Sequence, residues 1–428
     1  MSDKFREFDS YPMVVIIGGG FAGLNLAKKL AYKRFRVYVL DRNNYHTFQP
    51  LLYQVATGGL GSDAIAYPLR KIIGKLPNVA FRMANVTKIE PDKNKVITDV
   101  GDFNYDYLVI ASGSNTNYFG NKTLEVQSLP LKSVPEALNI RSYILQEFEK
   151  ALVNKDLSQK KRALNFVIVG GGPTGVELAG AMAEIRKNVI PKDYRELDAE
   201  HMTINLIEAG PRILAAMSEK SSKEAQEFLE NLGVNILLNT AVTSYENDEL
   251  SLSTGNKMET DTVIWSAGVK GQIINGFNEE SVFKSRYLVN DFNQITGLNN
   301  VFAIGDVACI KSQEFPNGHP MVAPVAIQQA DHLSKNLSKI AANKSMIPFK
   351  YFDKGSMATI GRNKAVVDLP FLHFKGWFAW YVWMFVHLMM LVGFRNRFMV
   401  FMNWAWNYIT YERAIRLIIR PYKRQFPS

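Results

Sequence analysis

Cysteine is nearly missing from this sequence, which contains Cys309 as its single thiol. One cysteine cannot form an internal disulfide, and it cannot provide the pair of thiols through which many redox proteins pass electrons. Its place just after Asp306 is typical of a buried small hydrophobic residue. The sequence therefore excludes chemistry that depends on a dithiol within the chain.

The N-terminal region lacks the pattern of a secretory signal. Residues 1–12 are charged and lead directly into an apolar segment, with no apolar core followed by a small-residue cleavage site. With 428 residues, of which 47% are hydrophobic and 21% charged, the chain has the composition of a folded protein with two or three domains. We therefore expect a globular body that stays in the cytoplasm.

Acidic residues are scarce in the last 58 residues. Residues 371–428 contain eight lysines and arginines and one acid, Glu412, so that +7 of the formal net charge of +10 lies there. The same region holds five of the six tryptophans. Because Trp and Tyr prefer the lipid headgroup level and basic residues attract anionic lipid, this composition favours contact with a membrane surface.

Two stretches of this basic region are predicted to be helical. Residues 376–394 are apolar apart from His387 and could barely cross a hydrocarbon core, so the sequence leaves open whether they span a membrane or lie on it. Residues 398–419 mix aromatic residues with arginines, and Arg413, Arg416 and Arg420 fall at spacings of three and four, which predicts an interfacial amphipathic helix. A core helix with a solvated basic face is the alternative.

A glycine pattern after an apolar segment indicates a first dinucleotide site. Residues 14–17 lead into Gly18-x-Gly20-x-x-Gly23 and a helix-compatible stretch. In such a pattern one glycine makes a tight turn, one lets the backbone approach a pyrophosphate, and one lets helix pack on strand. A second predicted strand ends at Asp41, 18 residues past Gly23, where its carboxylate could accept hydrogen bonds from a ribose.

The same order of features recurs about 150 residues later. Residues 166–169 precede Gly170-x-Gly172-x-x-Gly175, and the predicted strand 203–207 ends at Glu208, 33 residues past the last glycine. The longer spacing predicts an insertion in the helix or the loop after it. One such pattern alone could be an ordinary glycine turn, but two in the same order predict an α/β protein with two Rossmann-like domains.

A third segment resembles a known superfamily. Residues 296–306 read as a turn, a buried strand and then Gly305-Asp306, which is similar to the second flavin motif of the glutathione-reductase-like flavoproteins. The resemblance implies FAD at the first glycine pattern, with Asp306 at its ribityl and pyrophosphate region, and NAD(P)H at the second. The strand ends 108–113 and 263–268 are similar to the crossover points between the two domains of that superfamily.

Longer segments resemble one family within it, the type II NADH:quinone oxidoreductases. The carriers are residues 44–58, 175–180, 354–362 and 392–397. The resemblance implies that non-covalently bound FAD takes a hydride from NADH and that the electrons pass to a membrane quinone without proton pumping. It fits the missing dithiol, because the flavin itself would pass the electrons on.

The resemblance also implies a set of binding residues. Around the first glycine pattern and the Gly-Asp motif these are Gly18, Gly20, Phe21, Ala22, Gly23, Asp41, Arg42, His46, Val86, Ala111, Gly113, Asp306, Ala323 and Pro324. Around the second pattern they are Gly170, Gly172, Pro173, Thr174, Gly175, Glu208 and Gly268. Glu208 favours NADH, since its charge would repel the 2′-phosphate of NADPH, although nearby Arg212 could weaken that repulsion.

The family's quinone signature, Ala-Gln-x-Ala-x-Gln-Gln, departs from its pattern at one position. Here it reads Ala323-Pro324-Val325-Ala326-Ile327-Gln328-Gln329, which places Ala326, Gln328 and Gln329 at the quinone and puts in doubt any hydrogen bond at position 324. Proline suits the first turn of a helix, and that helix would direct its N-terminal dipole at the flavin. The alternative is that the glutamines only bond locally.

Glu177 is the predicted catalytic residue, because it matches the glutamate that the family places near nicotinamide and flavin. Its alternative role is a first-turn acid that complements a helix dipole. His46 is interpreted as a structural histidine. For His387 a role in quinone protonation stays open, but we favour contact with a lipid headgroup.

We predict an FAD domain from residues 1–120 and 285–345, an NADH domain over 121–284 and a membrane-docking region over 346–428. The expected protein is a homodimer, peripheral on the cytoplasmic side of the inner membrane, without a metal ion or a nucleic-acid partner. Two other functions remain open. A soluble ferredoxin or rubredoxin reductase should lack the aromatic basic tail. A non-catalytic NADH-sensing flavoprotein should spread its positive charge over the body, whereas residues 1–370 carry only +3.

Overall fold

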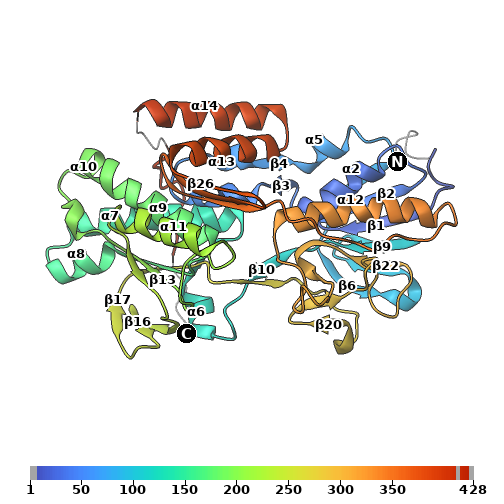
Figure 1. Cartoon of the computed structure of the whole chain (residues 1–428), viewed down its shortest axis with the longest axis horizontal. Helices are drawn as coiled ribbons and strands as arrows, with labels where there is room; N and C mark the ends of the chain where they lie inside the picture. Colours follow the sequence, from blue (N-terminus) through green and yellow to red (C-terminus); the bar gives the residue numbers. More distant parts are fainter. Residues whose placement is uncertain (1–6, 411–414, 424–428) are drawn as a thin grey trace. The chain divides into compact units, whose positions relative to one another are not determined.

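The computed structural model describes residues 7–410 and 415–423. They form two compact units, and the chain passes between them several times. Unit 1 consists of the described residues of Met1–His46, Tyr67–Asn115 and Val269–Asp353, and unit 2 of those of Thr47–Ala66, Thr116–Gly268 and Lys354–Ser428. The colours of Figure 1 make these crossings visible, because blue segments occur in both units.

Unit 1 is built on a five-stranded parallel sheet. Its order is β22 (Val301–Ala303), β9 (Tyr107–Ile110), β1 (Met13–Ile17), β2 (Arg36–Asp41) and β5 (Val79–Met83). Helices α2 (Phe21–Leu30) and α12 (Ala323–Ile340) lie side by side on one face, with α5 (Leu69–Ile73) nearby (Figure 1). The predicted strand 14–17 is therefore confirmed with one further residue, Met13, and the second predicted strand ends at Asp41 as expected.

The residues of β1 explain why both faces of this sheet are covered. Val14 and Ile16 point into the core beneath α2 and α12, whereas Val15 and Ile17 point into a second core on the opposite face. A run of apolar residues without alternation is typical of a parallel strand buried on both sides. Two small sheets belong to unit 1 as well, β6 (Val86–Glu90), β7 (Lys95–Thr98) and β8 (Gly101–Asn104), and β20 (Val282–Phe283), β21 (Arg286–Leu288) and β23 (Ala308–Cys309).

Unit 2 repeats the same architecture. Its parallel sheet has the order β11 (Leu129–Pro130), β18 (Thr262–Trp265), β12 (Asn165–Val169), β13 (Thr203–Ile207) and β14 (Asn235–Leu237). One face packs on the antiparallel strands β15 (Val242–Glu246), β16 (Glu249–Leu252) and β17 (Lys257–Glu259). The two parallel sheets confirm the prediction of an α/β protein with two Rossmann-like domains.

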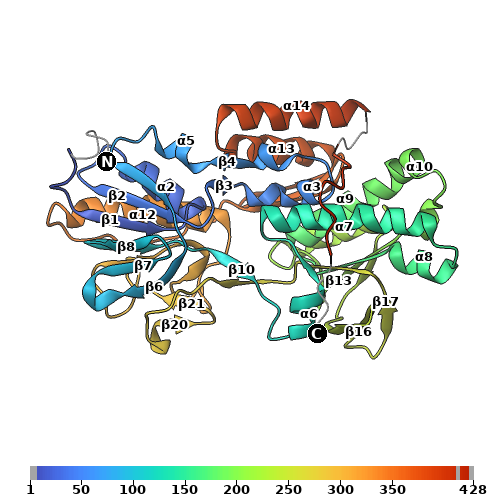
Figure 2. The ribbon, with the colours of Figure 1, turned by 180° about the vertical axis from the view of Figure 1, so that it is seen from behind.

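Helices surround the sheet of unit 2. The long ones are α7 (Val134–Val153), α9 (Pro173–Asn188) and α11 (Glu219–Glu230), and the short ones are α3 (Leu52–Ala56), α4 (Ser62–Ile65), α6 (Lys122–Gln127), α8 (Leu157–Ala163) and α10 (Ile190–Asp193). Seen from behind, α3 lies beside α7 and α9 (Figure 2). The insertion predicted before Glu208 is the long α9 followed by α10 and the 3₁₀ turn Ala199–His201.

The C-terminal part of unit 2 is a small sheet followed by two helices. Strands β24 (Ser356–Gly361), β25 (Lys364–Leu369) and β26 (Leu372–Lys375) are antiparallel, and α13 (Trp377–Met390) and α14 (Phe394–Thr410) follow.

Short two-stranded ladders pair β3 (Tyr45–Thr47) with β4 (Ala66–Pro68) and β10 (Ser114–Thr116) with β19 (Val269–Gly271). Over residues 7–410 and 415–423, no helix is both long enough and apolar enough to cross a membrane.

Charged side chains attach this small sheet to α11. His373 lies between two carboxylates, with Nδ1 2.8 Å from Asp368 Oδ1 and Nε2 2.9 Å from Glu224 Oε2. Lys375 Nζ is 3.2 Å from the other oxygen of Glu224. The C-terminal sheet is therefore held against a helix of the predicted NADH domain.

Candidate functional site

The glycine turn of unit 1 leaves room for a ligand at the N-terminus of α2. A Cβ at Gly23 would lie 1.9 Å from the carbonyl oxygen of Gly18, so only glycine allows this close packing of helix on strand. A Cβ at Gly20, the N-cap of α2, would meet no atom within 4 Å. Free N–H groups of a helix start thus face open space, which is the arrangement that binds a pyrophosphate.

Asp41 holds this turn in shape. Its Oδ2 accepts the N–H of Gly19 (2.6 Å) and its Oδ1 accepts the N–H of Asn43 (2.7 Å). Burial raises the pKa of the Asp41 carboxyl group, and these two backbone N–H groups partly offset the rise. The residue stands at the end of β2, as predicted, and keeps acceptor capacity on both oxygens for a ribose.

His46 belongs to the same turn as a structural residue. Its Nδ1 lies 3.0 Å from the carbonyl oxygen of Gly19, so the proton is on Nδ1, and its ring meets Phe21 edge to face. Burial lowers the pKa of His46 to about 4. The ring is therefore neutral at pH 7 and fixes the backbone of the glycine turn.

Residues far apart in the sequence meet beside this turn. Asp306 Oδ2 accepts a hydrogen bond from Ser114 Oγ (2.5 Å), and a Cβ at Gly305 would lie 3.3–3.4 Å from the Cβ atoms of Ala22 and Ala326. Unit 1 thus brings together the first glycine pattern, the Gly-Asp motif and the start of α12 with Ala323 and Pro324. Ala111 and Gly113 follow β9, Arg42 follows β2, and Val86 begins β6.

The glycine turn of unit 2 is built in the same way. A Cβ at Gly175 would lie 1.9 Å from the carbonyl oxygen of Gly170, and a Cβ at Gly172 would meet no atom within 4 Å. Pro173 and Thr174 open α9, and Gly268 follows β18. Glu208 Oε2 accepts the N–H of Gly171 (2.6 Å), as Asp41 does for Gly19 in unit 1.

The guanidinium of Arg212 bonds to backbone carbonyl groups of the loop after β13. It donates from Nη1 to the carbonyl oxygen of Met217 and from Nη2 to that of Ala215, both at 2.8 Å. Glu208 receives a second backbone N–H from Gly210 (2.7 Å). The end of β13 therefore presents a carboxylate, while the nearby guanidinium braces the following loop.

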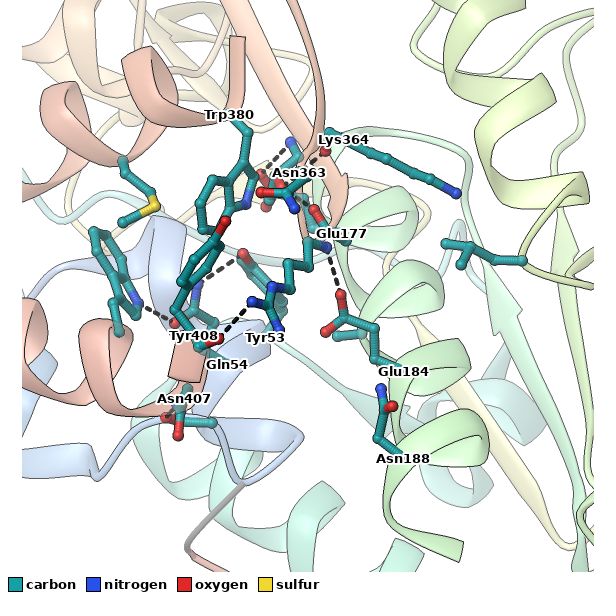
Figure 3. A pocket seen from close by; sticks show the side chains of 18 of the residues that line it. Tyr53, Gln54, Glu177, Glu184, Asn188, Asn363, Lys364, Trp380, Asn407 and Tyr408 are labelled. Atoms are coloured by element: carbon teal, nitrogen blue, oxygen red, sulfur yellow. Dashed lines mark hydrogen bonds between the residues drawn. The ribbon is translucent and has the colours of Figure 1, made fainter. Parts of the chain in front are cut away.

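A cavity of about 340 Å³ lies within unit 2, between α9, the β24–β25 hairpin, α3 and the two C-terminal helices (Figure 3). This volume falls in the range of small-molecule sites. Five aromatic residues line it together with polar side chains, which include Glu177, Glu184, Arg362, Lys364 and Asn407. The aromatic rings are those of Tyr53, Trp380, Trp383, Trp404 and Tyr408.

Glu177 is the buried acid of this cavity, only 7% exposed. Burial raises the pKa of Glu177 to about 8, although the N–H of Thr359 and the indole of Trp383 lower it in part. The N–H of Thr359 lies 3.4 Å from Oε1. At pH 7 the carboxyl group is therefore mostly protonated and can donate a hydrogen bond to a ligand oxygen.

Contact between α9 and β24 forms the floor of the cavity. A Cβ at Gly180 would lie 2.6 Å from the carbonyl oxygen of Ile360, so the helix and the strand touch only because residue 180 is glycine. This contact brings Thr359 to Glu177, one turn earlier on α9.

The aromatic wall is fixed by ring contacts and hydrogen bonds. Trp380 stacks on Tyr408 with centroids 5.6 Å apart, and the Arg362 guanidinium lies 3.9 Å from the centroid of Tyr408. Trp404 donates its indole N–H to Gln54 Oε1 (2.8 Å). The sequence pointed to none of these residues as a site, although the density of aromatics in the tail was a usable signal.

His387 is packed inside this wall. Its ring stacks on Trp383 with centroids 4.1 Å apart and meets Phe48 edge to face, and its Nδ1 lies 2.8 Å from the carbonyl oxygen of Trp383. Burial lowers the pKa of His387 to about 4. The ring of His387 thus stacks and bonds within unit 2, while its contact with a lipid headgroup stays a prediction.

Comparisons with known proteins identify the family to which this chain belongs. Residues 12–330 match the family model of the pyridine nucleotide-disulphide oxidoreductases, and residues 354–411 match an NDH2 C-terminal domain. A type II NADH:quinone oxidoreductase of Mycobacterium tuberculosis is 35% identical over 417 residues, covering 94% of this chain and 89% of the relative. The chain belongs to the type II NADH:quinone oxidoreductase family.

Other relatives support the assignment. The type II NADH:quinone oxidoreductase of Haemophilus influenzae is 31% identical to this chain, and the alignment covers 83% of this chain and 86% of the relative. Among solved structures, NDH2 from Plasmodium falciparum in complex with NADH superposes with a TM-score of 0.87 at 23% identity, over 96% of this chain and all of that one. At this identity the structural likeness shows the fold. Membership of the family makes the chain an oxidoreductase and a flavoprotein.

The glutamines of the family's quinone signature are both bonded within unit 1. Gln329, 1% exposed, accepts the N–H of Gly305 at Oε1 (2.6 Å). Gln328 donates to the carbonyl oxygen of Phe352 (2.8 Å) and accepts its N–H (3.0 Å). Pro324 sits in the first turn of α12, where its missing N–H leaves no carbonyl unpaired.

The tail differs from the prediction in one respect. Helix α14 is described as far as Thr410, and residues 415–423 are not helical, so the expected amphipathic helix over 398–419 is wrong for residues 415–419. Arg416 Nε instead pairs with Asp193 Oδ2 at the end of α10 (2.7 Å), and the N–H of Ile415 donates to Gly58 (3.3 Å). Arg420 lies in the same non-helical segment, and Arg413 lies outside the described residues.

Proposed function

We propose that this chain oxidises NADH through bound FAD and reduces a membrane quinone to quinol without pumping protons. The observation that carries the proposal is the pair of matching glycine turns, one in each unit. Each has an acid at the end of the second strand that accepts the N–H of a turn glycine, Gly19 for Asp41 and Gly171 for Glu208. Two sites of this design suit two dinucleotides.

The residues of unit 1 fit FAD. The open space at Gly20 suits a pyrophosphate at the helix N-terminus, and the Asp41 carboxylate suits a ribose. Asp306, oriented by Ser114, would accept hydrogen bonds from the ribityl region. When bound, FAD supplies the two-electron chemistry that connects hydride removal from NADH with quinone reduction.

The residues of unit 2 fit NADH. Gly172 and the N-terminus of α9 would hold the pyrophosphate, and Glu208 would bind the adenosine ribose. Because Arg212 is bonded to two loop carbonyls, it would have to break these hydrogen bonds to bind a 2′-phosphate beside Glu208. This supports a preference for NADH over NADPH.

For the quinone we propose that Glu177 donates a hydrogen bond, and one of the two protons that quinol formation needs, to an acceptor oxygen in the aromatic cavity of unit 2. Water would supply the second proton and the proton that restores Glu177. The protonated carboxyl group and the stacked rings suit a flat molecule with carbonyl oxygens. The positions Ala326, Gln328 and Gln329 remain a prediction from the family signature. The two glutamines would have to break their present hydrogen bonds to contact a ligand.

The outer surfaces of α13 and α14 support docking on a bilayer. Large apolar side chains are exposed along both helices, among them Phe385 at 66%, Phe398 at 53% and Trp406 at 57%. Side chains of this kind in a contiguous patch favour a lipid interface. We propose a peripheral homodimer on the cytoplasmic side of the inner membrane.

The decisive experiment compares electron acceptors. The purified protein should show the absorption spectrum of oxidised flavin, release FAD on denaturation, and reduce both ferricyanide and a quinone analogue with NADH. In sealed liposomes, quinone reduction should proceed without acidification of the lumen as reported by a pH-sensitive dye. A protein that reduces a ferredoxin or rubredoxin but no quinone would contradict the proposal.

A further inference from the structure

Unit 1 carries a basic surface that the net charge of the chain conceals. Three of its segments, residues 21–36, 67–78 and 323–346, contain eleven lysines and arginines but only one acid, Asp331. Residues 1–370 as a whole carry +3, so the rest of that stretch is net acidic. These three segments include α2, α5 and α12, and we call their cations the basic face.

The three segments form one surface. Lys33 donates from Nζ to the carbonyl oxygen of Ser334 (3.2 Å) and to Ser338 Oγ (3.0 Å), which joins the end of the α2 segment to α12. The Tyr32 hydroxyl donates to the carbonyl oxygen of Lys75 (3.4 Å), which joins it to the segment after α5. Both views of the ribbon place α2 next to α5 and α12 (Figures 1 and 2).

The positive charges are close enough to repel one another. Burial, and then the charges of Lys29 and Lys335, lower the pKa of Lys33. Two ion pairs offset part of the charge, Lys29 with Asp331 (3.3 Å) and Arg36 with Asp9 (2.7 Å). A crowded field of one sign costs stability, and it attracts a partner of opposite charge.

Helix dipoles account for only part of this surface. Lys28 and Lys29 lie in the last turn of α2, where a cation complements the dipole. Arg34 lies beyond the end of that helix, Lys335 lies in the middle of α12, and Lys75 follows α5. Helix dipoles therefore do not explain the positive charge of the basic face as a whole.

We propose that the basic face binds the anionic headgroups of a phospholipid bilayer, independently of the apolar surface of α13 and α14. The basic residues are spread over three helices and the segments that follow them. A plane of headgroups matches such a spread. Tyr32, 76% exposed beside Lys33 and Lys75, is an aromatic ring of the kind found at headgroup depth.

The experiment measures partition of the full-length holoprotein onto vesicles, and it needs neither NADH nor quinone, so its outcome is separate from that of the proposed function. The test variant carries Arg34→Gln, Lys71→Gln, Lys75→Gln and Lys335→Gln, all exposed positions. The matched control loses the same charge from other surfaces of unit 1, through Lys88→Gln, Lys93→Gln, Lys95→Gln and Lys311→Gln. Flavin content and the far-ultraviolet spectrum verify folding of both.

The first vesicles contain anionic phospholipid as about one third of their lipid, in about 0.1 M salt. On them we expect the test variant to partition at least about tenfold more weakly than the control. Its partition should also depend less on salt, and on purely zwitterionic vesicles the two variants should bind alike. Equal partition of both variants on anionic vesicles would overturn the proposal. So would loss of duplex DNA or RNA binding in the test variant with vesicle binding unchanged, because the surface would then serve nucleic acid.

Discussion

Trp404 donates its indole N–H to the side-chain oxygen of Gln54, 2.8 Å away, and so joins α14 to α3 at the wall of the aromatic cavity. The two residues are separated by 350 positions in the chain. Gln54 in turn donates from Nε2 to the hydroxyl of Tyr53 (2.9 Å), which places a second cavity residue in the same network. The C-terminal helix thereby fixes side chains that come from near the N-terminus.

Loss of the hydrogen bond between Trp404 and Gln54 should weaken quinone binding in the aromatic cavity. Trp404→Phe keeps an aromatic ring but leaves Gln54 without its donor, at a cost of about 1 kcal/mol. We expect a raised KM for quinone with little change in the rate of ferricyanide reduction. Trp406→Phe, at a position 57% exposed, is the matched control and should leave both unchanged. An unaltered quinone KM in Trp404→Phe would show that the bond does not shape the site.

The protonation of Glu177 should control quinone reduction. Since its pKa is raised to about 8, activity that depends on the protonated form falls as the pH rises through that value. Glu177→Gln should reduce the rate with quinone and remove this limb of the pH profile, while FAD stays bound. Glu227→Gln, an exposed glutamate of α11 outside the cavity lining, serves as the control. A pH profile that is the same in parent and Glu177→Gln would return Glu177 to a structural role.

The same shift affects stability. A free glutamate titrates near 4.5, whereas folded Glu177 holds its proton up to about pH 8, so folded-state stability is lost progressively across this window as the pH rises. Glu177→Gln removes the ionisation. The Tm of the variant should therefore exceed that of the parent most clearly at pH 8 and above, as measured by differential scanning calorimetry, and the difference should shrink toward pH 5.

Nucleotide preference should depend on Glu208 more than on Arg212. Glu208→Gln removes the repulsion of a 2′-phosphate and should raise kcat/KM for NADPH, but only modestly, because Arg212 stays bonded to Ala215 and Met217. Adding Arg212→Ala should then change the NADPH value little. If the double variant loses the increase in kcat/KM for NADPH, Arg212 must leave the loop carbonyls in Glu208→Gln and bind the 2′-phosphate.

Asp306 should determine FAD affinity. Asp306→Ala removes the acceptor that Ser114 orients, and each charge-assisted hydrogen bond to the flavin lost is worth roughly 1.5–3 kcal/mol. The variant should purify with little flavin and regain activity only at added FAD concentrations at least about tenfold higher. Asp102→Ala, a half-exposed acid of the same unit, is the control. Full flavin content in Asp306→Ala would exclude the proposed contact.

Membrane docking through the C-terminal helices should be sensitive to their exposed rings. Replacing Phe385, Phe398 and Trp406 with serine removes apolar surface without touching the cavity. We expect weaker partition onto liposomes even at high salt, and slower turnover with long-chain quinone but not with ferricyanide. Phe352→Ser in unit 1, at 66% exposure, is the control. Parental turnover with long-chain quinone in the triple variant would place quinone entry elsewhere.

The two proposed nucleotide sites follow from the sequence because the geometry of the glycine turns is local. The close approach of Gly23 to Gly18, and of Gly175 to Gly170, depends on residues five apart, so their spacing alone predicts the turn. Asp41 and Glu208 follow as the ends of the next strands. Such relationships repeat wherever a strand leads into a helix over a dinucleotide.

The aromatic cavity depends on contacts that the sequence does not encode locally. Glu177 is buried by Thr359 and Trp383, about 180 and 200 positions away, so its raised pKa could not be derived from its neighbours. Arg416 fits the spacing of an amphipathic helix, but its ion pair with Asp193, on another element, accompanies a non-helical backbone. His387 likewise finds Trp383 and Phe48, and no periodicity indicates that pairing.

Gly180 limits which C-terminal segments this protein can accept. With 2.6 Å between a Cβ at position 180 and the carbonyl oxygen of Ile360, the helix and the hairpin are matched surfaces, and a larger residue on α9 would push the hairpin away from Glu177. In a chimera that joins the two dinucleotide domains of one relative to the tail of another, the hairpin keeps its place only if the recipient helix has glycine at this position. The hairpin and α9 therefore have to be exchanged together for this contact to be kept.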